Sequence, residues 1–162
     1  MNLKSLRVSI PAITLPAPFL EEIERMPCFE TVLQNMWDLI SNAKHLVFVY
    51  PNWWGTYPSL LKGFIDRVFL PGFAFEYQEK SPFPKKLLTG KTARLIVTTD
   101  TPNWYYSLVY KKPGHNSMKK SILGFCGIKP VKISTFGSIK SSKDIQRKSW
   151  LDKVQKLGRG MK

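Results

Sequence analysis

The sequence predicts an α/β fold in three layers, and two observations carry this prediction. Apolar residues at helical spacing over 29–40 precede a continuous apolar run over 46–50, and the same alternation recurs further along the chain. Near-continuous apolar strands are typical of a parallel sheet buried on both faces, because the crossover helices pack against it. With 162 residues, 43% of them hydrophobic, the chain can form one domain with a single core.

The first elements are the most clearly patterned. The helix over 29–40 leads into the strand over 46–50, which Pro51 ends. A second helix is predicted over 57–69, where apolar residues follow the i, i+3, i+4, i+7 rule and Pro58 stands in the first turn.

The later elements continue the alternation. In order, they are a long irregular loop over 70–91, a strand over 93–99, a helix over 118–126, a strand over 131–135 and a closing helix through 150–157. The start of the closing helix carries Ser141-x-x-Asp144, the pattern of a capping box.

Composition limits the classes of protein. No apolar stretch is long enough to cross a bilayer and residues 1–20 lack the pattern of a secretion signal, so we expect a cytoplasmic protein. Cys28 and Cys126 lie far apart without CxxC spacing, and only two histidines are present. We therefore expect two structural thiols and no metal site.

The net charge of +14 is concentrated in the C-terminal third, where residues 111–162 hold fourteen Lys or Arg against Asp144 and Asp152. Such a surface could bind nucleic-acid phosphates or an anionic membrane, or attract an anionic substrate such as a nicotinamide dinucleotide. A solvated basic face is the more common explanation. Because no nucleic-acid-binding motif accompanies the charge, no nucleic-acid partner is expected.

Ligands of open parallel sheets bind beyond the carboxyl ends of the strands, which directs attention to the residues after 46–50. There, Pro51, Asn52, Trp53 and Trp54 place two large aromatics in a turn before a helix N-terminus. A flat ring system such as an isoalloxazine would find a stacking surface there. The alternative is an aromatic loop that packs on its own helix, and spacing alone does not decide between them.

A second candidate segment follows the next strand. Thr98, Thr99, Asp100 and Thr101 offer hydroxyl groups and backbone donors for the edge of a ligand, although an ordinary Asp/Thr turn followed by packed aromatics is the preferred explanation of this segment taken alone. His115 lies in a polar turn over 112–116, where an exposed loop histidine without a role is the common case.

Residues 45–75, which read HLVFVYPNWWGTYPSLLKGFIDRVFLPGFAF, closely resemble the NAD(P)H dehydrogenase (quinone) family. The resemblance extends over roughly 40–158. It continues through five further motifs: Gly90–Ala93, Thr98–Pro102, Trp104–Tyr106, Pro113–His115 and Leu123–Gly127.

This resemblance implies a flavodoxin-like three-layer sandwich, a homodimer, and FAD, alternatively FMN, as cofactor. The flavin would take hydride from NAD(P)H and pass two electrons to a quinone or similar acceptor. It implies that Pro51 to Trp54 line the flavin and that Thr98 to Thr101 border its ring. Tyr106 and His115 resemble the catalytic Tyr and His that stabilise negative charge at the N1 and O2 edge of the flavin.

The N-terminal part departs from the family. Members open with a buried strand and a loop that binds the flavin phosphates, whereas the first glycine here is Gly55 and residues 1–28 read as an irregular segment with at most a strand over 7–10. We expect a single domain over 1–162 with a family-like core over 29–158, truncated so that the first strand and phosphate loop are missing.

The departure leaves an alternative function open. A chain without the phosphate loop would have weak activity unless a second polypeptide supplies the strand. Relatives of the family also serve as ancillary subunits of potassium-efflux systems, so a flavin-poor regulatory subunit with a peripheral membrane-protein partner, or an inactive remnant, is the alternative to the enzyme.

Overall fold

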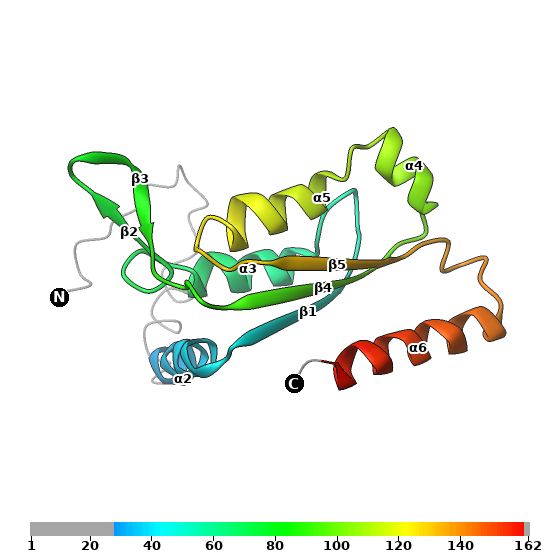
Figure 1. The fold of residues 1–162 in the computed structure, drawn as a ribbon, viewed down its shortest axis with the longest axis horizontal. Coiled ribbons are helices and arrows are strands. Elements are labelled where there is room, and N and C mark those ends of the chain that lie inside the picture. Colours follow the sequence, from blue (N-terminus) through cyan, green and yellow to red (C-terminus); the bar gives the residue numbers. More distant parts are fainter. Residues whose placement is uncertain (1–27, 161–162) are drawn as a thin grey trace, which may run out of the picture.

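A computed structural model describes residues 28–160 (Figure 1). Three parallel strands form the main sheet in the order β1-β4-β5, with β1 at His45–Pro51, β4 at Thr92–Thr98 and β5 at Val131–Phe136. The predicted parallel α/β arrangement is confirmed. The expected strand over 7–10 and the question of a missing first strand lie outside the described residues.

Helices connect the strands and flank the sheet. They are α2 (Cys28–Asn42), α3 (Ser59–Val68), α4 (Asn103–Leu108), α5 (Pro113–Asn116), the π-helix η2 (Ser117–Leu123) and α6 (Asp144–Arg159). Figure 1 shows α3 and the α5–η2 run on one side of the sheet and α6 on the other. No helix of the part described is long and apolar enough to cross a membrane.

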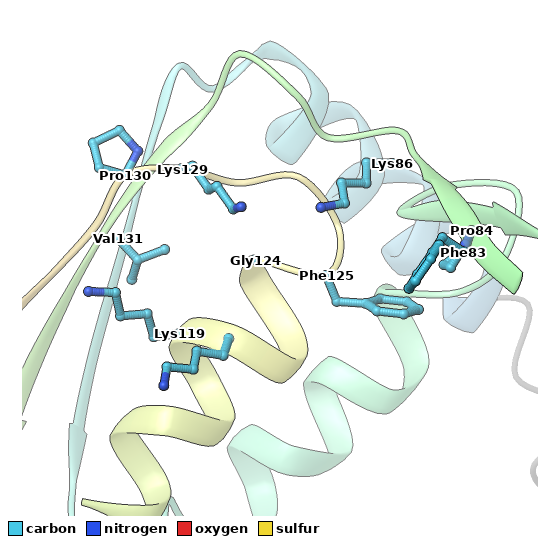
Figure 2. A pocket seen from close by; sticks show the side chains of 10 residues that line it. Phe83, Pro84, Lys86, Lys119, Gly124, Phe125, Lys129, Pro130 and Val131 are labelled. Atoms are coloured by element: carbon cyan, nitrogen blue, oxygen red, sulfur yellow. The ribbon is translucent and has the colours of Figure 1, made fainter.

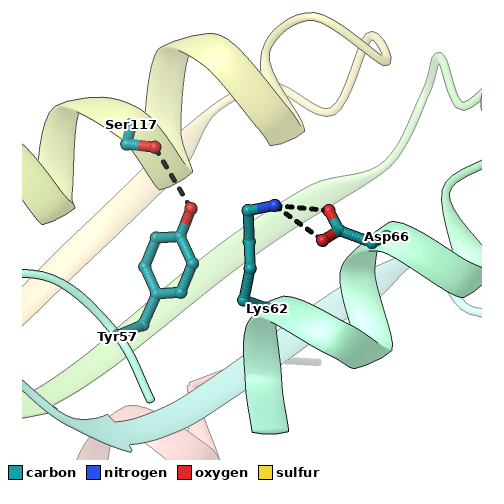
Figure 3. A network of polar contacts seen from close by, with 4 residues as sticks. All are labelled: Tyr57, Lys62, Asp66 and Ser117. Carbon is teal, nitrogen blue, oxygen red and sulfur yellow. Dashed lines mark hydrogen bonds and ion pairs between the residues drawn. The ribbon is translucent and has the colours of Figure 1, made fainter. Parts of the chain in front are cut away.

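The core lies between the sheet and the side that carries α3 and η2. Leu95, Val97, Met118 and Leu123 are completely buried there. A hydrogen bond of 3.2 Å between the hydroxyl groups of Tyr57 and Ser117 joins the start of α3 to η2 (Figure 3).

Polar contacts also lie at the border of this core. Lys62 forms an ion pair with Asp66 one turn further along α3, at 2.6 Å (Figure 3). The indole N–H of Trp37, on α2, donates to the carbonyl of Val68 at 2.9 Å and fixes α2 against α3. Cys126 is buried, and burial raises the pKa of its thiol to about 11, as suits a structural thiol.

The other face of the sheet is less completely covered. Val47 and Val49 point outward from β1 with 43% and 69% of their surface exposed. Within the described residues no strand pairs with the outer side of β1, and α6 buries no residue completely. The contact of α6 with the sheet includes Trp150, whose ring lies 5.6 Å from that of Phe136.

The prediction of an irregular loop over 70–91 is wrong. This segment contains an antiparallel hairpin of β2 (Phe75–Gln78) and β3 (Ser81–Lys86). Pro82 and Pro84 hide the strand pattern in the sequence. They are tolerated because each strand of a two-stranded ribbon leaves one edge without ladder hydrogen bonds.

One expected turn is a short helix. The polar turn over 112–116 becomes α5, with Pro113 in its first turn, where a missing N–H is harmless, whereas α4 begins only at Asn103, after the Asp/Thr segment over 98–101. The capping box is also wrong, because α6 begins at Asp144 after Lys143, and the Ser141 hydroxyl donates to the carbonyl of Ser138 at 3.3 Å instead.

Candidate functional site

The carboxyl ends of β1 and β4 are joined by hydrogen bonds between the loops that leave them. The backbone N–H of Asn52 donates to the carbonyl of Thr98 at 2.7 Å. The side-chain amide of Asn52 donates to the hydroxyl of Thr99 at 3.4 Å. Asp100 accepts the N–H of Lys140 at 2.7 Å, which brings the loop after β5 to the same edge.

A cavity of about 250 Å³ opens at this edge. Its lining consists of Pro51, Asn52, Trp53, Thr98, Thr99, Asp100, Thr101 and Ile139. Seven of these eight residues are the ones that sequence patterns and the family resemblance single out. The structure therefore brings together two segments that lie more than forty residues apart in the chain.

The loop after β1 turns tightly between Trp53 and Thr56, whose backbone groups exchange two hydrogen bonds of 2.9 Å. The central residues Trp54 and Gly55 both adopt left-handed backbone, with φ of 51° and 80°. Glycine does so freely, whereas for a bulky residue the cost is about 1–3 kcal/mol.

This strained turn exposes two indole rings to solvent. The side chain of Trp54 is fully exposed and that of Trp53 is 60% exposed. The full exposure of Trp54 argues against the interpretation that its ring packs on its own helix. A strained, exposed indole beside a cavity is typical of a surface kept for a ligand.

Trp54 also lines a second cavity, of about 400 Å³, with Asn52, Gly55, Thr101, Tyr110 and Pro113. Asn52 and Thr101 belong to both cavities, so the two adjoin. All eight residues predicted to contact flavin thus surround one pair of cavities. Gly55, Tyr110, Pro113 and Ile139 were not predicted. Gly55 and Pro113 stand inside quoted motifs and could have been chosen, whereas nothing in the sequence marks the other two.

The hydrogen-bond donors of this edge are mostly used within the protein. The N–H groups of Asn52, Trp53, Thr99 and Thr101 all have acceptors among nearby residues. In the turn, the N–H groups of Trp54 and Gly55 have no acceptor among the described residues and remain for a ligand.

Tyr106 and His115 lie behind the turn. The Tyr106 hydroxyl is almost wholly buried and donates to the carbonyl of Gly55 at 2.9 Å. Burial raises its pKa, although the nearby backbone N–H groups of Gly114 and His115 oppose the shift. Its hydroxyl therefore contacts the turn.

His115 is buried in α5, so the expectation of an exposed loop histidine is wrong. Its ring lies 5.0 Å from that of Tyr106, and its Nε2 lies 3.5 Å from the hydroxyl of Thr135. Burial, and secondly the charge of Lys112, lowers its pKa. Both residues line a third cavity of about 580 Å³. The structure thus places the predicted catalytic pair next to the predicted flavin residues but in a different cavity.

The contact between α5 and the turn after β1 depends on a glycine. Gly114 packs against the turn so closely that a Cβ atom would lie 2.8 Å from both the Gly55 carbonyl oxygen and the Thr56 Cα. The N–H of Gly114 also donates to that carbonyl, at 3.0 Å. The segment Pro113 to His115 therefore supports the turn that presents Trp54.

This fold and this edge define an α/β protein with a parallel sheet and a candidate ligand site beyond the carboxyl ends of its strands. The family described as flavodoxin-like fold matches residues 14–158, and the chain belongs to this family.

Individual relatives agree with this placement. An uncharacterized NAD(P)H oxidoreductase of Haemophilus influenzae is 30% identical over 121 residues, which are 74% of this chain and 59% of the relative. The FMN-dependent NADH:quinone oxidoreductase 3 of Bacillus cereus is 36% identical over 87 residues, or 54% of this chain and 40% of the relative. This chain thus spans between two fifths and three fifths of the length of these two relatives.

A solved structure resembles most of this chain. The Smu.1420 protein of Streptococcus mutans superposes with a TM-score of 0.73 at 36% identity, over 80% of this chain and 67% of that protein. The expected flavodoxin-like arrangement is confirmed.

Proposed function

We propose that this protein is a flavin-dependent NAD(P)H:quinone oxidoreductase. The flavin ring would lie against Trp53 and Trp54, with Thr98 to Thr101 along its border. When bound, the flavin would accept hydride from NAD(P)H and pass two electrons to a quinone or similar acceptor. The observation that carries the proposal is the strained turn that exposes Trp54 beside two adjoining cavities.

The residues present fit such a ring. Exposed indoles offer an apolar face for stacking, and the N–H groups of Trp54 and Gly55 offer donors for a polar edge. The name of the Bacillus cereus relative supports FMN as the flavin. FAD, the first expectation from the resemblance, has no such support.

Tyr106 and His115 would act on the flavin site from the adjoining side of the turn, where they line the third cavity. The Tyr106 hydroxyl fixes the Gly55 carbonyl, which orients the N–H groups on the outer side of the turn. We retain the prediction that both residues serve the N1 and O2 edge of the flavin. In this arrangement Tyr106 does so by positioning the turn, while neutral His115 offers a ring nitrogen that can take up or release a proton.

We also propose that the protein forms a homodimer beside this site. The supporting observation is an exposed apolar surface on α4, where Trp104 and Leu108 are 64% and 73% exposed. Sedimentation of the purified chain at several concentrations tests this, and a monomer at every concentration would contradict it.

Flavin binding is the decisive experiment. The purified chain is titrated into FMN, and separately into FAD, while quenching of flavin fluorescence is followed. We expect saturable quenching, and oxidation of NAD(P)H when a quinone is added. Trp54→Gly keeps the backbone geometry and removes the ring, so affinity should fall about 2-fold to 10-fold, the worth of one aromatic stack.

Tyr77→Leu is the control, because Tyr77 is a largely exposed aromatic residue on β2 that lines neither flavin cavity. Its affinity should equal that of the parent chain. A folded chain that binds neither flavin would overturn the proposal and favour the flavin-poor ancillary subunit.

A further inference from the structure

A cavity of about 720 Å³ lies at the opposite end of the sheet from the flavin cavities (Figure 2). Three segments surround it: the end of the β2–β3 hairpin, the η2 helix with the loop after it, and the start of β5. It shares no residue with the two cavities assigned to flavin. Its volume falls within the range of about 300–1,000 Å³ that is usual for small-molecule sites.

One part of the lining is aromatic. Phe83 and Phe125, which Figure 2 shows near one another, are 76% and 37% exposed. The ring of Phe125 is fixed by an edge-on contact of 4.9 Å with Phe75. Apolar rings held open at a concave surface are typical of a binding site.

The other part of the lining is cationic. Lys86, Lys119, Lys120 and Lys129 line the cavity, and no carboxylate does so. Within the described residues none of the four has an ion pair, although the adjacent Lys85 pairs with Glu76 at 3.4 Å. In Figure 2 the side chains of Lys86 and Lys129 extend toward one another. Four uncompensated positive charges around one space repel each other, and an anion would relieve that repulsion.

The backbone frame holds these groups in place. The N–H of Leu88 donates to the carbonyl of Cys126 at 3.0 Å, and the N–H of Lys129 donates to that of Lys91 at 2.9 Å. Gly127 lies so close to the hairpin that a Cβ atom would be 3.0 Å from the Cβ of Lys86. The lysines and the rings are therefore brought together by packing, and not by chance extension of long side chains.

We propose that this cavity binds a small amphiphilic anion, in which a flat apolar body of one or two rings carries a carboxylate or sulfonate group. The rings would pack against Phe83 and Phe125, and the anionic group would face the lysines. A bare inorganic anion would gain nothing from the phenyl rings, and a neutral aromatic would gain nothing from the charges. The ligand class follows because phenyl rings and lysines line the same cavity.

The test uses naphthalene-2-sulfonate as the probe, measured by isothermal titration calorimetry on the full chain at low ionic strength. Naphthalene-2-sulfonamide has the same shape without the charge, and sulfate has the charge without the rings. We expect one site for the sulfonate, at least tenfold weaker binding of the sulfonamide, and no measurable heat with sulfate. Equal affinity for sulfonate and sulfonamide, or no sulfonate binding, would overturn the proposal.

Two pairs of variants locate the site. The double variant Lys120→Gln with Lys129→Gln should weaken sulfonate binding at least tenfold. Lys153→Gln with Lys156→Gln removes the same charge from exposed positions on α6 and should change affinity less than twofold. An equal loss in both would show that only net charge attracts the probe, and would refute the site.

The second pair tests the aromatic wall. Phe83→Ser should lower sulfonate affinity several-fold. Tyr77→Ser changes an equally exposed ring on the other strand of the hairpin and should leave it unchanged. All these positions are exposed, so circular dichroism should show parent-like folding. Retention of full affinity by Phe83→Ser would exclude the proposed orientation.

Discussion

The two ends of the sheet are built on the same strands but are organised by different interactions. At the carboxyl end, backbone groups and polar side chains contact one another directly. The Tyr106 hydroxyl donates to the Gly55 carbonyl, and the backbone N–H of Lys140 donates to the Asp100 carboxylate. At the amino end, charged side chains surround open space and do not pair. Backbone contacts frame both ends, but the cavity at the amino end also carries four lysines that have no ion pair within the described residues.

This difference predicts how each end responds to substitution. Close contacts at the carboxyl end leave no room for an added atom, so stability should depend on single groups there. Removing unpaired, exposed lysines at the amino end should leave stability almost unchanged, since surface substitutions usually alter it by less than about 0.5 kcal/mol. Measurements of stability can therefore test the comparison without any ligand.

The largest effect is expected for Gly114→Ala. Its added methyl group would lie 2.8 Å from the Gly55 carbonyl oxygen and from the Thr56 Cα, so the backbone must move. Overpacking of this kind costs about 1–3 kcal/mol. The free energy of unfolding, from urea titration followed by circular dichroism, should fall by that amount.

Gly63→Ala is the control for this substitution. A Cβ atom at Gly63 meets nothing within 4 Å, and the residue lies inside α3. Alanine favours helix over glycine by about 1 kcal/mol, so this variant should be as stable as the parent or slightly more stable. If Gly114→Ala behaves like Gly63→Ala, the carboxyl end is not tightly packed and the comparison fails.

A smaller effect is expected for Tyr106→Phe. This variant removes the hydrogen bond to the Gly55 carbonyl, which keeps a second donor in the N–H of Gly114. The loss should therefore be that of one net hydrogen bond, about 0.5–1.5 kcal/mol, in the same urea titration.

Tyr50→Phe is the matched variant, because the buried hydroxyl of Tyr50 has no hydrogen-bond partner among the described residues. Removing it should leave stability unchanged or raise it. Equal losses in the two tyrosine variants would mean that the contact with Gly55 contributes nothing.

Much of the fold could be predicted because local pattern and tertiary position agree. The helical spacing over 57–69 buries Ile65 and Val68 as its pattern indicates, and the apolar run over 46–50 forms the predicted strand, although Val47 and Val49 remain exposed on one face. The hairpin was missed since its prolines contradict a strand, and its pairing depends on a partner strand that local pattern does not show. The start of α6 was missed because the capping-box pattern of Ser141 and Asp144 forms no such contact.

The candidate site was predictable only in part. The segments after β1 and β4 stand at strand ends, which topology brings to one edge, so their residues could be chosen from the sequence. That the Tyr106 hydroxyl contacts the turn, and that Tyr106 lies outside the two flavin cavities, depends on how α4 and α5 fold back, which no spacing reveals. The lysines of the opposite cavity come from three separate segments and resemble any solvated basic surface until they are seen together.

The smallest effect is confined to a range of pH and concerns His115. Burial lowers the pKa of this residue below its ordinary value of 6.5, with the charge of Lys112 as a second cause. Above pH 6.5 the imidazole is neutral in both the folded and the unfolded chain, and its contribution to stability is fully present. As the pH falls below 6.5, the unfolded chain binds the proton first, so stability is lost until the pH passes the pKa of the folded state. His115→Gln should remove this loss, so that the difference in urea midpoint between pH 7.5 and pH 5 becomes smaller than in the parent. The same pH dependence in both proteins would show that the imidazole is not held neutral, and that this part of the carboxyl end is open to water.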